Sequence, residues 1–144
     1  MRCRVILSGL AFAFALFIAG PASAARIIVS IDGLHSAQGN IFVGLYSNPR
    51  EFLNGNHCDK FVKVRASTGP VTVAFDNLQP GTYAVGAYHD ENGNDHLDTN
   101  FLGLPTEGYA LSNGARAVLS RPEFHQAAFT VGNGDRPVGL HIQY

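Results

Sequence analysis

Hydrophobic side chains recur at every second position in a series of short segments, which is the pattern of half-buried β-strands. The clearest segment, 40–46, places Ile41, Val43 and Leu45 on one face. The same alternation predicts strands at 27–31, 61–65, 71–75, 82–89, 124–131 and 137–142, with a further short strand near 109–111. No stretch of ten or more residues has the 3.6-residue period of a helix; only residues 49–53 fit one short helical turn.

Turn signals separate these segments and complete the fold prediction. The prolines fall at the joints between predicted strands: Pro49, Pro70, Pro80, Pro105, Pro122 and Pro137. Asn133-Gly134-Asp135 predicts a hairpin turn between the last two strands, and Pro80-Gly81 predicts a tight turn between two antiparallel strands, with Gly81 at positive φ. The sequence therefore predicts an all-β fold, an antiparallel β-sandwich of about seven strands with one long ordered loop.

The first 24 residues have the three parts of a secretory signal peptide. Arg2 and Arg4 give a positive start, residues 5–19 are apolar, and Ala22-Ser23-Ala24 fits the small-residue pattern that signal peptidase cleaves. About 15 apolar residues are few for a hydrocarbon core ~30 Å thick, so a retained membrane anchor is the weaker alternative. We expect cleavage after Ala24, a single domain at 25–144, no integral membrane span after processing, and a periplasmic or secreted location.

Removing the signal peptide changes the charge and the cysteine count. The whole chain has 144 residues, with ten Lys and Arg and eleven Asp and Glu. The remaining 120 residues keep eight basic and eleven acidic side chains, so they offer no basic stripe for a phosphate backbone, and we expect no nucleic-acid partner. Cys58 becomes the only cysteine, which excludes an internal disulfide and leaves a buried inert thiol, a reactive thiol or a bridge between two chains.

The longest stretch without a predicted strand begins at Asp90, and it carries a repeating set of oxygen atoms. Loops longer than about 12–15 residues are uncommon in compact domains unless they are functional or disordered. Ca²⁺ prefers six to eight oxygen ligands, which a tightly curled loop delivers from alternate side chains and one backbone carbonyl. The candidate ligands are Asp90, Asn92, Asn94 and Asp98, the backbone carbonyl of His96, and Glu107.

This loop differs from an EF-hand calcium loop in two positions. Counted from Asp90, the sixth residue is Asp95 in place of glycine, although Asp adopts the left-handed conformation more readily than most residues. The twelfth residue is Phe101 in place of the bidentate glutamate, so Glu107 is the nearest carboxylate that can complete the site. The alternative is a metal-free turn, because Asn, Gly and Asp favour turns by themselves.

Two further functions use the same region. A small periplasmic hydrolase would take its general acid and base from the carboxylates of the loop: Asp90, Glu91, Asp98 and Glu107. A transition-metal site would draw on the nitrogen and sulfur ligands: His89 and His96, with His57, Cys58 and His125 elsewhere. The seven-residue spacing of His89 and His96 is not a ligand signature.

Three segments resemble a known family. They are 75–85 (FDNLQPGTYAV), 89–94 (HDENGN) and 97–109 (LDTNFLGLPTEGY), followed by Ser112-Asn113. They resemble the exported bacterial family catalogued as domain of unknown function 2141, and the resemblance covers nearly all of residues 25–144. It implies a small periplasmic or secreted β-sandwich and no known activity. The LQPGTY turn is also similar to transthyretin-like and collagen-adhesin modules, so the expected sandwich is immunoglobulin-like or transthyretin-like.

The leading hypothesis from the sequence is an exported, non-catalytic β-sandwich module. Its long loop binds Ca²⁺ for stability or for recognition, and an unknown protein or glycan is its expected class of partner. The hydrolase and the transition-metal protein remain as the alternatives.

Overall fold

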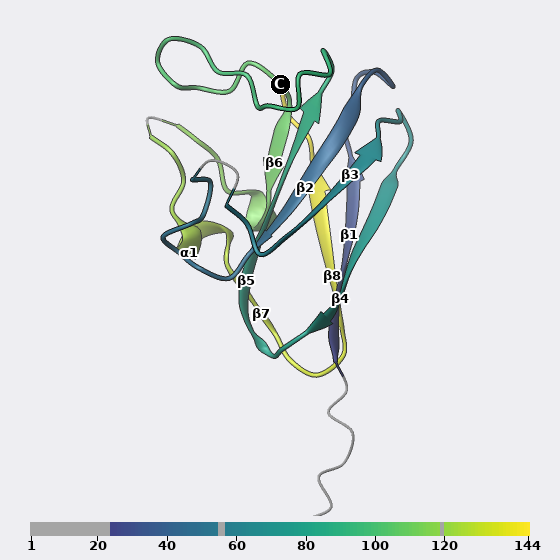
Figure 1. Cartoon of the computed structure of the whole chain (residues 1–144), viewed down its shortest axis with the longest axis vertical. Helices are drawn as coiled ribbons and strands as arrows, with labels where there is room; N and C mark the ends of the chain where they lie inside the picture. The colour runs from purple at the N-terminus through teal and green to yellow at the C-terminus, as the bar shows by residue number, and fades with distance from the viewer. Residues whose placement is uncertain (1–23, 55–56, 119) are drawn as a thin grey trace, which may run out of the picture.

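Eight strands form two sheets that pack face to face (Figure 1). The computed structural model describes residues 24–54, 57–118 and 120–144. The elements are β1 (Ala25–Asp32), β2 (Asn40–Tyr46), β3 (Lys60–Arg65), β4 (Val71–Leu78), β5 (Gly81–Asp90), β6 (Tyr109–Leu111), the 3₁₀ turn η1 (Ser112–Gly114), α1 (Phe124–Ala127), β7 (Phe129–Val131) and β8 (Asp135–His141). The all-β sandwich predicted from the sequence is confirmed, with eight strands where about seven were expected.

The chain passes back and forth between the two sheets. One sheet has the order β4-β1-β8; the other has the order β3-β2-β5-β6, and β7 also pairs with β5. The pairs are antiparallel except for β1 and β8, which run parallel with Val29 opposite Val138. The three-stranded sheet is therefore mixed, because β8 runs parallel to β1 whereas β4 runs antiparallel to it.

Alternation along each strand builds the core between the sheets. In β2 the side chains of Ile41, Val43 and Leu45 are completely buried, while the intervening side chains stay on the outer face. The inner faces of both sheets supply the other large buried side chains of the core: Ile27, Val29, Ile31, Val73, Phe75, Val85, Leu140 and Ile142. This core needs no helix, which agrees with the helix-poor sequence.

The predicted strand at 124–131 is only partly correct. Residues 124–127 form the helical turn α1, and only Phe129–Val131 is a strand. The turn begins where the Glu123 backbone N–H donates to the Gln126 side-chain oxygen and the Gln126 N–H donates back to the Glu123 carbonyl. These local bonds satisfy backbone groups that a strand would have had to pair across a sheet.

Both predicted hairpin turns instead connect the two sheets. The strands around Asn133-Gly134-Asp135 separate, since β7 pairs with β5 and β8 pairs with β1. Pro80-Gly81 likewise leads from β4 in one sheet to β5 in the other. The residue with positive φ near that turn is Asn77, at 57°, and not Gly81. The hairpin predictions are therefore wrong, because turn residues report a change of direction but not the partner of the strand that follows.

The outer face of the five-stranded sheet is covered unevenly. Near the start of β5, a second apolar cluster of Phe52, Leu111 and Ala127 packs over Ala84. At the other end of the sheet, a long loop leaves β5 after Asp90 and projects beside the C-terminus (Figure 1). The candidate functional groups lie in that loop and on the uncovered part of the face.

The predicted signal peptide, residues 1–24, lies outside the described residues except for Ala24. Within the described ranges, no helix has the length and apolar character that crossing a bilayer requires.

Candidate metal centre

Asp90 organises the beginning of the long loop. Its side chain is completely buried at the end of β5. Oδ1 accepts hydrogen bonds from the backbone N–H groups of Gly93, at 2.8 Å, and Asn94, at 3.2 Å, and Oδ2 accepts one from Asp95, at 2.9 Å. The carboxylate therefore curls five residues of chain around itself, as the first position of a calcium loop does.

The sixth position of the loop has the conformation expected for it. Asp95 has a φ of 64°, which is left-handed. Its carboxylate accepts a hydrogen bond from Lys63 Nζ at 2.5 Å, and its carbonyl accepts one from the Tyr88 hydroxyl at 3.4 Å. The Asp95 side chain thus points away from the loop interior and ties the loop to β3 and β5.

Asn92 and Asn94 lie on either side of the Asp98 carboxylate. The Asn92 amide nitrogen donates to Asp98 Oδ2 at 2.6 Å, and the Asn94 amide nitrogen donates to Oδ1 at 2.9 Å. The amide oxygens face the chain instead, because each accepts a backbone N–H two residues further on, from Asn94 and from His96. Three of the predicted ligands are therefore in direct contact.

A small hairpin brings the third carboxylate to this cluster. Thr99 pairs with Pro105 in an antiparallel bridge, and the Thr106 N–H donates to the Asp98 carbonyl at 2.9 Å. The turn between them places Glu107 beside Asp98, whose N–H donates to Glu107 Oε2 at 3.1 Å. Glu107 therefore lies next to Asp98 although it is nine residues further along the chain.

The Glu107 carboxyl is in an unfavourable electrostatic position. Burial raises its pKa above the ordinary value and the negative charges of Asp98 and Asp90 raise it further, although the hydrogen bond from the Asp98 backbone N–H acts in the opposite direction. Oε1 is shielded from solvent and has no hydrogen-bond partner among the described residues. Among the described residues, no Lys, Arg or His forms an ion pair with Asp90, Asp98 or Glu107.

His96 lies on the outside of the loop with an exposed side chain, and the structure records a bond only for its backbone N–H. Across residues 24–54, 57–118 and 120–144, no three side chains of His, Cys, Asp or Glu converge closely enough to hold a metal ion. The cluster thus contains the predicted residues, but their side chains are hydrogen-bonded to one another and to the backbone of the loop.

His89 is committed to a different network. Its ring is completely buried; Nε2 is 2.7 Å from the Gln38 carbonyl and Nδ1 is 2.6 Å from the Tyr144 hydroxyl. Because a carbonyl only accepts, Nε2 carries the proton, and Nδ1 of the neutral ring accepts from Tyr144. His35 stacks on the Tyr144 ring with centroids 3.6 Å apart. Both ring nitrogens of His89 are therefore occupied, which counts against the transition-metal alternative.

Glu91 and Cys58 have environments that weaken the catalytic alternatives. The Ser36 hydroxyl donates to Glu91, and this bond, with His35 and His89 nearby, holds the pKa of the Glu91 carboxyl below its usual range. An ionised, hydrogen-bonded Glu91 is a poor general acid. Burial raises the pKa of the half-buried Cys58 thiol, and Asp59 raises it further, so the reactive thiolate is disfavoured.

Sequence reasoning missed the role of Ser112. Its buried hydroxyl accepts the Val85 N–H at 2.9 Å and donates to the Ala127 carbonyl at 2.6 Å. The neighbouring Asn113 has a φ of 58° and donates to the Ala128 carbonyl at 2.7 Å. These two residues fasten α1 to β5 where β6 ends. Their adjacency in the sequence was visible, but their partners are brought close only by the fold.

Comparison with known proteins identifies the family of the chain. Residues 29–138 match the family described as "Uncharacterized protein conserved in bacteria (DUF2141)". The chain belongs to this family. The DUF2141 match covers both sheets and the whole Asp90–Glu107 cluster, and the resemblance inferred from the sequence is confirmed. No match was found among curated proteins or among solved structures.

Proposed function

We propose that this DUF2141 protein is an exported, non-catalytic β-sandwich module whose loop binds one Ca²⁺ ion for stability or recognition. The ion would lie among Asp90, Asn92, Asn94, Asp98 and Glu107, with the His96 carbonyl as a further ligand. The signal-peptide pattern of residues 1–24 supports export to the periplasm or the exterior, where calcium is more available than in the cytosol.

The observation that carries the calcium proposal is the state of Glu107. A shielded carboxylate oxygen without a hydrogen-bond partner lies beside a second carboxylate, and burial makes this costly. No positive side chain of the described residues compensates the three negative charges. A divalent cation would relieve that repulsion, since calcium takes carboxylate, amide and carbonyl oxygens.

Calcium binding requires a local rearrangement. Asp98 now accepts hydrogen bonds from the amide nitrogens of Asn92 and Asn94, and both amide oxygens are bonded to backbone N–H groups. The two amide groups must turn so that their oxygens face the ion and Asp98 is released. The bonds that Asp90 accepts need not change, because they set the curl of the loop.

Calcium affinity should be low. Carboxylates are few, and part of the binding energy is spent on turning the amides, so we expect a Kd toward the ~10⁻⁴–10⁻³ M of extracellular modules. At a free concentration of about 100 Kd, binding would raise the free energy of unfolding by roughly 2.7 kcal/mol. This stabilisation would hold the loop against the end of the sandwich.

The test is thermal melting of the purified protein after EDTA treatment, with and without millimolar CaCl₂. We expect calcium to raise the melting temperature and to slow amide exchange at 90–98. Glu107→Gln should remove the calcium-dependent shift, because it deletes a ligand charge at constant shape. Glu123→Gln is the matched control; the Glu123 side chain is 79% exposed next to α1, outside the loop cluster, and should leave the shift intact.

Two results would refute calcium binding: melting and amide exchange that millimolar calcium leaves unchanged, or a full calcium shift in Glu107→Gln. MgCl₂ should substitute poorly, since Mg²⁺ requires a smaller octahedral shell. Export is tested separately. Mass spectrometry of the extracytoplasmic protein should find an N-terminus at or near Ala25, and an intact Met1 would refute it.

A further inference from the structure

The outer face of the five-stranded sheet contains a trough with a glycine floor. Phe61 on β3, Gly44 on β2, Gly86 on β5 and Leu111 on β6 lie opposite one another in one row across the sheet. The two central positions have no side chain, whereas the two outer ones are large. Glycine within a strand weakens the strand, and two facing glycines often mark a place where another group approaches the backbone.

Aromatic side chains form the walls along the strands. In the next row, the Phe42 and Tyr88 rings stack with centroids 4.9 Å apart, and Lys63 Nζ lies 4.9 Å from the Phe42 ring centroid. On the other side, the Tyr46 ring lies across the glycines, since a Cβ atom on Gly44 would be 3.1 Å from its hydroxyl. A Cβ atom on Gly86 would be 3.0 Å from the Leu111 side chain, so the two glycines let these larger side chains pack close to the sheet.

The long loop covers the trough from one end, and the segment before α1 borders the other. Leu97, Leu102, Leu104 and Pro105 line the groove from the loop, and Arg121-Pro122 line it from the other segment. The enclosed volume is about 620 Å³. Pockets for small molecules typically enclose roughly 300–1,000 Å³. A protein partner would instead require a broad open face.

The polar groups that line the groove are few. Burial raises the pKa of Tyr46 and of Tyr88 to about 12, so both hydroxyls stay protonated. Within the described residues, the Tyr46 hydroxyl has no hydrogen-bond partner. The Asp95 carboxylate is paired with Lys63, and His96 and Arg121 are exposed. Apart from these exposed side chains, the groove offers a free hydroxyl and no unpaired charge.

We propose that this groove binds a small, uncharged aromatic compound, with its ring against Tyr46 and the Phe42–Tyr88 pair and a polar substituent at the Tyr46 hydroxyl. Ring contacts with these aromatic side chains add to the burial of apolar area. A cation would find no unpaired carboxylate among the described residues that line the groove, because Asp95 is paired with Lys63. This site does not depend on calcium binding.

The first experiment uses the uncharged fluorescent probe N-phenyl-1-naphthylamine. We expect a saturable rise in its fluorescence with one site per chain. Leu102→Asp places a charge in the roof of the groove and should weaken probe binding by about tenfold or more, since apolar contact is lost. Leu102 is already 67% exposed, so this variant should fold as the original protein does.

Phe101→Asp is the matched control for this substitution. Phe101 is the adjacent residue, is 95% exposed and does not line the groove. Probe binding should therefore be unchanged in Phe101→Asp. Equal weakening in both variants, or no saturable signal, would overturn the proposal. A second variant, Gly44→Ala, narrows the floor and should also weaken binding.

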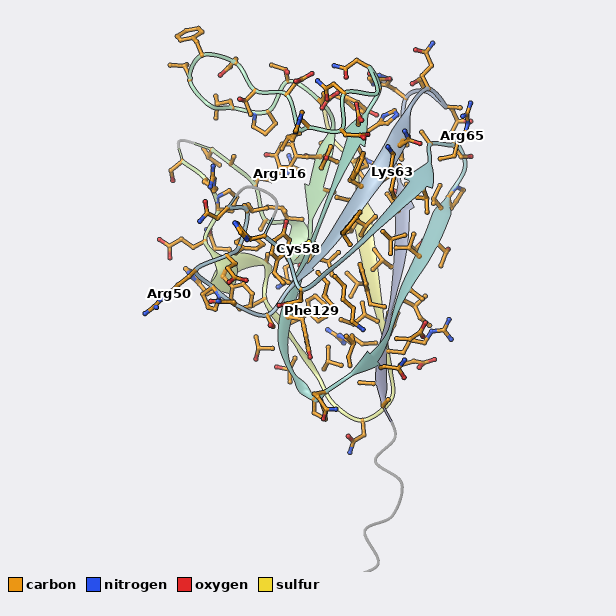
Figure 2. The ribbon with its side chains drawn as sticks, in the orientation of Figure 1. Arg50, Cys58, Lys63, Arg65, Arg116 and Phe129 are labelled. Atoms are coloured by element: carbon orange, nitrogen blue, oxygen red, sulfur yellow. The ribbon has the colours of Figure 1, made fainter. Side chains whose placement is uncertain are left out.

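Cys58 provides a measurement at the groove itself. Cys58 lines the groove just before β3, and Figure 2 labels Cys58 ahead of that strand and Lys63 along it. Saturating probe should slow the alkylation of Cys58 by N-ethylmaleimide, followed by mass spectrometry of the peptide that contains it. Unchanged alkylation would place the probe elsewhere and overturn the proposal. The proposal would also be overturned if sedimentation showed that the chain self-associates as its concentration rises and the probe were lost at the same time, because a second copy would then occupy the groove.

Discussion

The long loop has two halves that are built in opposite ways. Residues 90–98 are polar, and the carboxylates of Asp90 and Asp98 accept five hydrogen bonds between them. Residues 99–105 form a hairpin whose tip, Phe101-Leu102, is largely exposed. The first half is held by hydrogen bonds within itself and to the sheet, whereas the second half is held within the hairpin, where the Asn100 side chain accepts the N–H groups of Leu102 and Leu104.

The two halves of the loop are therefore suited to two different functions. A segment that must hold an ion needs its oxygens positioned before the ion arrives, and the bonds to Asp90 provide that order. A segment that covers an apolar groove needs freedom to open, and an exposed tip with few contacts opens at low cost. Substitutions in the first half should therefore affect stability, while substitution of Leu102 at the tip should affect binding to the groove alone.

The largest effect is expected where the loop meets the start of β2. A Cβ atom on Gly39, which has a φ of +69°, would lie 1.9 Å from the carbonyl oxygen of Asp90. This contact is with backbone, so no side-chain rotation relieves it. Gly39→Ala should lower the free energy of unfolding by about 3 kcal/mol or more, measured by urea denaturation.

Gly93→Ala is the control for Gly39→Ala. Gly93 has a similar φ of +74°, but a Cβ atom there would have nothing within 4 Å. Only the backbone cost remains, about 1–2 kcal/mol. If the two variants lose equal stability, the start of the loop is not held against β2 as described.

The second effect concerns the buried carboxylate of Asp90. Asp90→Ala leaves the backbone N–H groups of Gly93 and Asp95 without an acceptor and removes one of the two acceptors of the Asn94 N–H, so we expect a loss of about 2–3 kcal/mol in calcium-free buffer. Asn92→Ala removes only the other acceptor of the Asn94 N–H, at an exposed site, and should cost less than about 1 kcal/mol. Equal urea midpoints for the two variants would contradict the central role of Asp90.

The sequence predicted those features of the fold that depend on local pattern. Alternation located β2 at 40–46, because side chains that point inward on a strand must be apolar. It failed for 124–131, where a pair of local hydrogen bonds between Glu123 and Gln126 decided in favour of a turn. It also failed for strand pairing after Pro80-Gly81, because pairing depends on where the whole sheet lies.

The sequence predicted which residues belong to the candidate site but not how their side chains contact one another. The spacing of Asp90, Asn92 and Asn94 predicted a curled loop, and the structure has one. The direction of the two amide groups could not be predicted, since it depends on competing backbone donors. The groove was missed for a different reason. Gly44 and Gly86 are far apart in sequence, and only the pairing of β2 with β5 makes them neighbours.

A smaller effect concerns the pH dependence of stability through Glu107. Its pKa in the folded protein is raised by burial and by the neighbouring carboxylates, so folding favours the protonated form. The resulting stabilisation is present below the ordinary glutamate pKa of about 4.3 and is lost as pH rises through the raised folded value. In calcium-free buffer, Glu107→Gln should therefore gain stability relative to the original protein as the pH increases across this interval.

Urea midpoints of both proteins at several pH values give this difference directly. Calcium should reverse the sign of this stability difference at neutral pH, because the ion favours the ionised carboxylate of Glu107. A difference that does not vary with pH would show that Glu107 is solvated normally.

The smallest effect is expected at the tip of the hairpin. Phe101 is 95% exposed, so Phe101→Ser removes almost no buried area and should change the free energy of unfolding by less than about 0.5 kcal/mol. Urea denaturation should be repeated at low and high protein concentration. A loss of stability that appears only at high concentration would mean that the ring is buried against a second copy of the chain. In that case, the second half of the loop would be an interface and not a free cover for the groove.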